Sequence, residues 1–272
     1  MVSKAIFVSL FLMLFLSSVF FPENHKIRFG HLSADDGLHG TAVNSILQDE
    51  EGFLWFGTNN GLFKYNGYTF KVYNFEPGNP GSLSHNFINV IYEDKNNEIW
   101  IGTVRGINRY DKNKDIFTKY FYDSEDLFTL DDNVILSIIG DESGNILVGT
   151  GRGLNLFDKT GNRFIRYTYK TEESKESISN AIFTLSAEKN GKIWMGTKRG
   201  VYLFYGKKKI LISFRGNSDK KCPLNSCAVE AIYRGSDGIV WIGTDFCGLY
   251  KYDSHKDILS KVRVKQKTVM DG

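Results

Sequence analysis

The stretch LWFGTNNGLFKY, residues 54–65, decides the fold because it returns four more times along the chain. Every copy contains a Gly-Thr pair that follows an apolar run, and all but one have a tryptophan in that run. We call the first glycine of each copy the anchoring glycine. These glycines are spaced by 45 residues and then three times by 47, at Gly57, Gly102, Gly149, Gly196 and Gly243. A fixed period of this size predicts an array of similar supersecondary units.

Each unit divides into four short strands, as the copy around Gly102 illustrates. NFINVIYED alternates apolar and polar residues, NEIWIGT follows a tight turn, GINRYD comes after a short loop, and DIFTKYFY closes the unit. Four-stranded units with a period of about 40 to 50 residues are typical of a β-propeller, whose blades pack against their neighbours. We therefore predict an all-β fold with five blades, at about residues 41–75, 86–122, 133–169, 180–215 and 227–262, and a tail at 263–272.

The repeated aromatic residues are interpreted as core. A tryptophan lies two residues before most anchoring glycines, and its neighbours at alternate positions are apolar on both faces. We expect these side chains to fill the space between blades rather than to stack on sugars. They are Trp55, Trp100, Trp194 and Trp241, with Leu147 in the third copy, and the ring that ends each third strand is expected to do the same: Tyr65, Tyr110, Phe157, Phe204 and Tyr252.

Composition excludes several classes of function. The 272 residues carry a net charge of +3, which gives no strong field for nucleic acid or an anionic membrane. The glycines follow neither the dinucleotide-binding nor the P-loop order. We predict no cofactor and no metal, because the five histidines are scattered and the three cysteines have no histidine at ligand spacing.

The two ends of the chain differ in their chemistry. Lys4 precedes an uncharged run from Ala5 to Phe21, which is typical of a secretory signal, although an uncleaved membrane anchor would look similar. An exported chain reaches an oxidising compartment, so the cysteines of the last repeat predict one disulfide and one free thiol. Cys227 could pair with either of the other two, Cys222 or Cys247.

These motifs resemble a known family. The pattern [IVL]W[IFM]GT, a second glycine followed by an aliphatic and then an aromatic residue, and HLSADDGL ahead of the first copy are similar to the two-component-regulator propeller repeats, over about Ile27 to Lys261. The resemblance implies the periplasmic sensor region of a hybrid two-component histidine kinase. Such regions usually hold two seven-bladed propellers, an immunoglobulin-like domain and a membrane helix before the kinase and response-regulator modules. Many members sense oligosaccharides released from polysaccharides. Implied partners are an oligosaccharide or other small ligand and a membrane-bound signalling protein.

The chain departs from that pattern at both ends. It stops at Gly272 after five repeats and without a kinase, so we expect a truncated product, a fragment, or a chain that signals through a partner. A closed five-bladed ring is geometrically possible as well. IRFGHLS, from Ile27, resembles the outer strands and is predicted to close a final blade. Unpaired, this strand and the faces of the first and fifth blades predict a poorly stable or self-associating chain.

Three functional classes are compatible with a propeller of this kind. Similar repeats occur in the streptogramin lyases, but an enzyme needs a convergent catalytic set, and no His, Asp or Glu recurs at the positions expected to face the channel. We therefore predict a sensor without catalytic residues, and keep a protein-interaction platform as the alternative to it. Binding to glycans rather than to periplasmic proteins would separate these two.

Two sets of residues are candidates for ligand binding. The loops that join one blade to the next are about twelve residues long, and recognition residues concentrate on such loops. The alternative is that the loops only cover the blades. Asparagines end three of these loops, and each either caps its own loop or offers its amide to sugar hydroxyls. They are Asn86, Asn133 and Asn180.

The second set follows the Gly-Thr pair. Three successive copies read TVRG, TGRG and TKRG, which places an arginine three residues after the anchoring glycine. Paired with acidic loop residues, these arginines would be structural. Unpaired, they would grip the carboxylate or sulfate groups of an acidic oligosaccharide, aided by stacking on an aromatic ring. The set comprises Asn60, Arg105, Arg152, Arg199 and Phe246.

Overall fold

The computed structural model describes residues 30–39, 42–167, 170–171, 174–177, 181–188, 190–205, 210–214, 224 and 227–263. The chain divides into two compact units, Met1–Ser33 and Ala34–Gly272, and the repeats lie in the second. Of the predicted closing strand, residues 30–33 form no strand and residues 27–29 lie outside the described ranges. Among the described residues, no helix has the length and apolar character that a membrane span requires.

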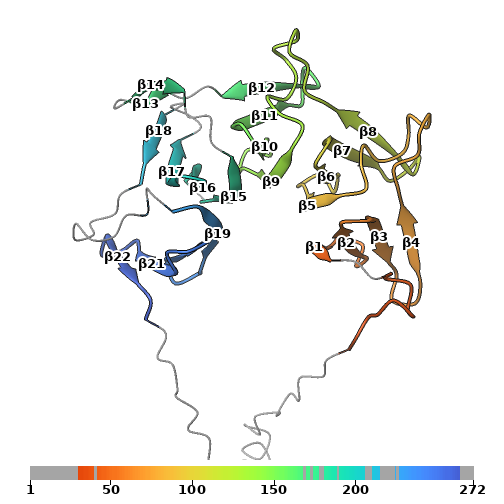
Figure 1. Cartoon of the computed structure of the whole chain (residues 1–272), viewed down its shortest axis with the longest axis horizontal. Helices are drawn as coiled ribbons and strands as arrows, with labels where there is room; N and C mark the ends of the chain where they lie inside the picture. The colour runs from red at the N-terminus through yellow and green to blue at the C-terminus, as the bar shows by residue number, and fades with distance from the viewer. Residues whose placement is uncertain are drawn as a thin grey trace, which may run out of the picture. The chain divides into compact units, whose positions relative to one another are not determined.

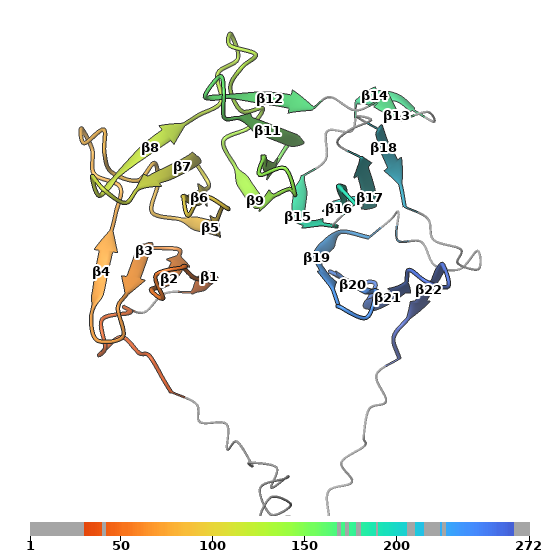
Figure 2. The same cartoon turned by 180° about the vertical axis from the view of Figure 1, so that it is seen from behind.

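Five four-stranded antiparallel sheets follow one another in the described part of the second unit, which confirms the predicted β-propeller fold class (Figure 1; Figure 2, from behind). In each sheet, or blade, the strands pair in chain order, and the first strand is the innermost. Blades 1 to 3 comprise β1 Val43–Gln48, β2 Leu54–Thr58, β3 Gly61–Tyr65 and β4 Phe70–Tyr73; β5 Ile88–Glu93, β6 Ile99–Thr103, β7 Gly106–Asp111 and β8 Ile116–Tyr120; and β9 Ile135–Gly140, β10 Ile146–Thr150, β11 Leu154–Asp158 and β12 Arg163–Tyr167. Blades 4 and 5 comprise β15 Ile182–Ala187, β16 Lys192–Thr197, β17 Gly200–Tyr205 and β18 Ile210–Ser213; and β19 Val229–Arg234, β20 Ile239–Thr244, β21 Leu249–Asp253 and β22 Ile258–Lys261.

One further pair of strands lies in the loop between blades 3 and 4. It comprises β13 Lys170–Thr171 and β14 Ser174–Ser177, which pair antiparallel. The sequence there is polar and has no alternation, so the pair was not predicted.

The tight turn between the first two strands has the same geometry in all five blades. The fourth residue of the turn donates its N–H to the carbonyl of the first, as in Gly52 to Asp49 at 2.8 Å. This fourth residue has a positive φ, a conformation that glycine and asparagine tolerate. The residues concerned are Gly52, Asn97, Gly144, Gly191 and Gly238, with φ between 61° and 89°.

Large side chains fill the space between neighbouring blades. Trp55 packs with Ile91 of the next blade, and the ring of Trp100 lies 4.8 Å from that of Phe157 in an edge-to-face contact. Leu147 takes the place of a tryptophan between blades 3 and 4. The predicted core role is thus confirmed for four of the five positions, whereas the ring of Trp241 in the last blade is only partly buried.

In three of the five blades, an acidic residue at the start of the turn accepts a hydrogen bond from the indole of the same blade. Asp49 accepts hydrogen bonds from the N–H of Phe53 at 2.9 Å and from Nε1 of Trp55 at 2.8 Å. Because a buried indole N–H without a partner would be costly, the acid and the tryptophan depend on each other. Equivalent bonds join Asp94 to Trp100 and Glu188 to Trp194, and Asp141 binds the amide of Asn145 where leucine replaces the tryptophan.

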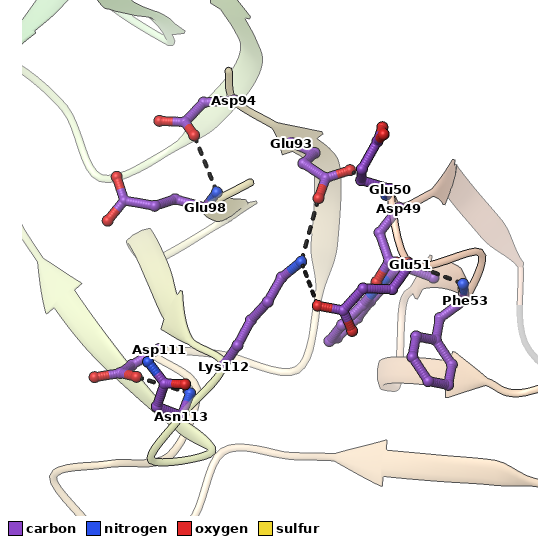
Figure 3. Close-up of polar contacts among 11 residues, drawn as sticks. Asp49, Glu50, Glu51, Phe53, Glu93, Asp94, Glu98, Asp111, Lys112 and Asn113 are labelled. Atoms are coloured by element: carbon purple, nitrogen blue, oxygen red, sulfur yellow. Dashed lines mark hydrogen bonds and ion pairs between the residues drawn. The ribbon is translucent and has the colours of Figure 1, made fainter. Parts of the chain in front are cut away.

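Lysines tie this acidic end of one blade to the next blade. Lys112 of blade 2 places Nζ 3.2 Å from Glu51 of blade 1 and 3.3 Å from Glu93 of its own blade (Figure 3). Lys159 of blade 3 reaches back to Asp94 at 2.9 Å. Burial opposes the charge of Lys112, but its two carboxylate partners outweigh burial and raise its pKa.

These buried carboxylates predict a loss of stability in acid. Burial disfavours ionisation of Asp94, but hydrogen bonds from Lys159 and from backbone N–H groups outweigh it and hold the pKa of Asp94 below its ordinary value. Glu188 has a lowered pKa for the same reason, with Lys192 and Trp194 as partners. Such a group stabilises the fold above its unfolded pKa, about 4, and this contribution disappears as the pH falls through its folded pKa.

We therefore expect the urea midpoint to fall steeply below about pH 4. An Asp94→Asn variant should be less stable than wild type near neutral pH and should lose less stability between neutral pH and strong acid. Glu125→Gln, at an exposed loop position, is the control and should keep the wild-type profile. A wild-type pH profile in Asp94→Asn would contradict the prediction.

The long loops run along the outer edge of the following blade. The carbonyl of Gly81 accepts a hydrogen bond from Phe117 of β8 at 2.8 Å, and that of Phe128 accepts one from Phe164 of β12 at 2.9 Å. The loops thereby pair with strand edges that would otherwise be open. Three of the four long loops also bury a leucine nineteen residues before the anchoring glycine of the following blade: Leu83, Leu130 and Leu224.

Candidate functional site

The repeated threonine fixes the hairpin that carries each candidate arginine. Oγ1 of Thr103 donates to the carbonyl of Gly106 at 2.8 Å and accepts from the N–H of Arg105 at 2.9 Å. Gly106 has a φ of 98°, which a residue with a side chain would adopt only with strain. The same pair of bonds occurs around Thr58, Thr150 and Thr197, and fixes Asn60, Arg152 and Arg199.

All five hairpins are attached at the same place. The residue after each threonine donates its N–H to the residue before the innermost strand of that blade, and we call this end of a blade its hairpin end. In addition, Gly61 and Gly106 donate to the carbonyls of Asn86 and Asn133, at 2.8 and 2.6 Å, and so link neighbouring blades. The five bonds are Asn59 to Ala42, Val104 to Phe87, Gly151 to Val134, Lys198 to Ala181 and Asp245 to Ala228.

The three arginines are all exposed but do not have the same partners. Nε of Arg152 lies 3.9 Å from Asp132, and its guanidinium lies 5.4 Å from the centre of the Tyr122 ring. Arg105 and Arg199 make no side-chain hydrogen bond or ion pair with any other residue that the structure describes. Within the described residues, two of the three guanidinium groups are therefore without an acidic partner.

The charge of Arg199 acts on a neighbouring tyrosine. Burial raises the pKa of Tyr202, and the positive charge of Arg199 acts in the opposite direction. Tyr202 follows Arg199 by three residues, on β17, and is half-buried.

The asparagine candidates close their own loops where the structure describes them. Oδ1 of Asn86 accepts the N–H of Phe75 at 2.6 Å, and Oδ1 of Asn133 accepts that of Tyr122 at 2.8 Å. Each bond joins the two ends of one long loop. Asn180 lies outside the described residues. The amide oxygens of Asn86 and Asn133 are thus engaged in the loop, although their carbonyl groups help to place the hairpins.

Phe246 is the aromatic member of the candidate set, on the hairpin of the last blade. Its side chain is 95% exposed, on the one hairpin that is longer by a residue. A disulfide between Cys227 and Cys247, with 6.2 Å between the Cα atoms, ties this hairpin to the start of the innermost strand. This settles which of the two predicted pairings Cys227 makes, and Cys222 lies outside the described residues.

The disulfide should contribute measurably to the free energy of unfolding. It closes a loop of 20 residues, for which chain entropy gives a stabilisation of about 3 kcal/mol. We expect Cys247→Ser to lower the free energy of urea unfolding by roughly this amount, while Cys222→Ser should change it little. Thiol titration of the unfolded wild type should find one free thiol. Three titrating thiols without reductant would contradict the pairing.

The candidate side chains at the hairpin ends are cationic, polar and aromatic. In the described ranges, no three His, Cys, Asp or Glu side chains are placed to hold a metal ion. The groups at hand are guanidinium, amide and aromatic, which suit an anionic or hydroxyl-rich ligand.

Comparisons with known proteins agree with this architecture. A family model described as the two-component regulator propeller matches residues 37–60, 82–105 and 223–246, and each match ends within the hairpin of its blade. Three of the five repeats thus match two-component-regulator propeller repeats. Over 76 residues it is 38% identical to a histidine kinase of Formosa agariphila, a match that covers 28% of this chain and 6% of the kinase.

Solved structures extend the match to most of the propeller repeats. An extracellular domain assigned to a hybrid two-component system of B. thetaiotaomicron is 28% identical, with a TM-score of 0.72 over 85% of this chain and 31% of the other. The chain is thus homologous to extracellular sensor domains of such systems and spans about a third of that relative. Virginiamycin B lyase of Staphylococcus aureus, at 11% identity and a TM-score of 0.62 over 83% of this chain and 71% of the lyase, shares the fold alone.

Proposed function

We propose that the propeller repeats form a ligand-binding sensor of a two-component system, exported to the periplasm, and that its ligand is an acidic oligosaccharide. The observation that carries the proposal is the pair of exposed guanidinium groups, Arg105 and Arg199, that have no side-chain partner among the described residues. Both stand on hairpins fixed by a buried threonine. The ligand would therefore meet cations that are already in place, which lowers the entropy cost of binding.

The chemistry of the neighbouring side chains supports an acidic sugar. Guanidinium groups bind carboxylate and sulfate with paired hydrogen bonds, and the exposed ring of Phe246 offers a face on which a sugar ring can stack. Homology to extracellular sensor domains supports binding rather than catalysis. The sensor works without chemistry of its own, and binding is passed to a signalling partner in the membrane.

A calorimetric screen of neutral, carboxylated and sulfated oligosaccharides on the full chain tests the proposal. We expect binding of acidic sugars only, weakened by added salt. The Arg105→Ala/Arg199→Ala double variant should bind at least about tenfold more weakly, since each charged hydrogen bond contributes roughly 1.5 to 3 kcal/mol.

Arg234→Ala provides the control, because Arg234 is an exposed arginine at the opposite end of its blade. It should bind like wild type. Equal binding by wild type and the double variant would make the arginines structural. If no acidic sugar bound but a periplasmic protein did, the repeats would be an interaction platform instead.

A further inference from the structure

In blades 2 and 3, a short turn closes the long loop just before the innermost strand. In blade 2 the side chain that holds this turn is His85, whose Nδ1 accepts the N–H of Phe87 at 2.9 Å. In blade 3 it is Asp132, whose Oδ1 accepts the N–H of Val134 at 3.1 Å. Both side chains give the backbone the same support, so the turn alone does not require an acid at Asp132.

The second carboxylate oxygen of Asp132 faces the hairpin of its own blade. A Cβ added to Gly151 would lie 2.6 Å from this oxygen, so the hairpin approaches the acid more closely than a residue with a side chain allows. The same oxygen lies 3.9 Å from Nε of Arg152. The hairpins of blades 2 and 4 have Val104 and Lys198 at the position of Gly151. Glycine in blade 3 thus makes room for an acid beside the arginine.

A second carboxyl group lies at the hairpin end of blade 3. Oδ1 of Asp131 accepts hydrogen bonds from Oγ1 of Thr150 at 2.6 Å and from Nδ2 of Asn155 at 2.7 Å. In blade 2 the hydroxyl of Ser84 takes this place, 3.0 Å from Oγ1 of Thr103. Blade 3 therefore holds two acids where blade 2 holds a hydroxyl and an imidazole, and its hairpin end attracts anions less.

The charge at the hairpin ends consequently changes along the blades. Blade 3 packs between blades 2 and 4 (Figure 1). Arg105 of blade 2 and Arg199 of blade 4 have no acidic partner among the described residues. Between them, the charge of Arg152 is compensated by Asp132. Two cationic hairpin ends thus flank one whose cation is compensated.

We propose that Asp132 is a specificity-determining residue of the ligand site, and that the ligand is an oligosaccharide in which acidic and neutral units alternate. This inference rests on the proposed function. Acidic units meet Arg105 and Arg199, whereas a neutral unit lies at blade 3, where Arg152 and Asp132 offer donors and acceptors to its hydroxyls. A uniformly acidic chain places an anionic unit opposite Asp132, and the repulsion of like charges disfavours it.

Calorimetry on the full chain with two sets of oligosaccharides of equal length tests the proposal. One set alternates uronic acid with neutral sugar, and the other consists of uronic acid alone. We expect the wild type to bind the alternating set at least about fivefold more tightly, although the uniform set carries more charge. If the wild type bound the uniform set equally or more tightly, the inference would be wrong and the proposed function would stand. If it bound neither set, both would fail.

Asp132→Asn separates the charge of this residue from its role in the turn. Asparagine keeps an oxygen that can accept the N–H of Val134, so the urea midpoint should stay close to that of wild type. Without the negative charge, the variant should bind the uniform set at least about fivefold more tightly than wild type does and lose its preference for the alternating set. A folded variant that kept the wild-type preference would show that Asp132 serves the turn alone.

Asp126→Asn is the matched control. Asp126 lies in the same long loop, and its Oδ1 likewise accepts a backbone N–H, that of Phe128 at 2.8 Å. It is exposed in the part of the loop that runs along the outer edge of blade 3, so its substitution makes the same change in net charge away from the hairpin end. This variant should keep the wild-type preference. An equal loss of preference in both variants would make the effect one of net charge and would overturn the role of Asp132.

Discussion

Replacing Trp100 with alanine should lower the free energy of unfolding by about 3 to 5 kcal/mol, the range for a large aromatic removed from a core. The ring is fully buried between blades 2 and 3 and makes edge-to-face contact with Phe157. Its removal also leaves Asp94 without the indole N–H that it accepts. Urea unfolding followed by far-ultraviolet circular dichroism, which does not depend on the lost indole, would measure the change.

Trp241 is the matched control for this substitution. It has the same place in its repeat, but it lies in the last described blade and is only partly buried. Trp241→Ala should therefore lower the free energy of unfolding clearly less than Trp100→Ala does. Equal losses at the two positions would mean that burial between blades does not set the contribution of this residue.

Replacing Gly102 with valine should lower the free energy of unfolding by about 3 kcal/mol, because overpacking a closely packed site displaces its neighbours. A Cβ at this position would lie 2.6 Å from both Cγ2 of Ile135 and Cγ1 of Val90, so even the first carbon has no space. The neighbours are branched side chains near the backbone and cannot turn away. We expect little folded protein at physiological temperature and a large drop in the urea midpoint.

Glycine-to-valine substitution at Gly243 tests whether glycine is required by packing against the neighbouring blade or by its own strand. There a Cβ meets only Ala231, at 3.6 Å, and valine is favourable in strands. Gly243→Val should leave stability unchanged or slightly higher. If both variants were equally destabilised, the glycine would be required by its own strand, and the role of the neighbouring blade would be refuted.

Much of the candidate site follows from the repeat. The hairpins are recognisable from the Gly-Thr pair and the second glycine, and the candidate side chains of Asn60, Arg105, Arg152 and Arg199 are exposed there. The sequence could not predict how many of the three arginine side chains have an acidic partner. Whether an arginine forms an ion pair depends on the position of an acidic residue in a separate loop. Among the described residues, Arg152 alone of the three has such a partner, Asp132.

One structural signal was present in the sequence and was missed. An acidic residue lies eight positions before the anchoring glycine in four of the five copies, at Asp49, Asp94, Asp141 and Glu188. Their backbone carbonyls accept the hydrogen bond that closes each of these four turns. Their carboxylate binds the indole or an amide of the same blade, as the bond from Trp55 to Asp49 shows.

By itself the sequence determined the all-β class, the period, the four strands of each blade and the place of each tight turn. These features depend on contacts within one hairpin, where residues that alternate in polarity or tolerate positive φ are neighbours in the chain. Only the tertiary structure decided which side chains meet across blades. Ile88 covers Gly57, the loop through Gly81 protects β8, and Val43 has no such partner among the described residues. Contacts of that kind join residues about 30 or more positions apart, and they form only when whole blades pack, because neither half can bury its apolar face alone.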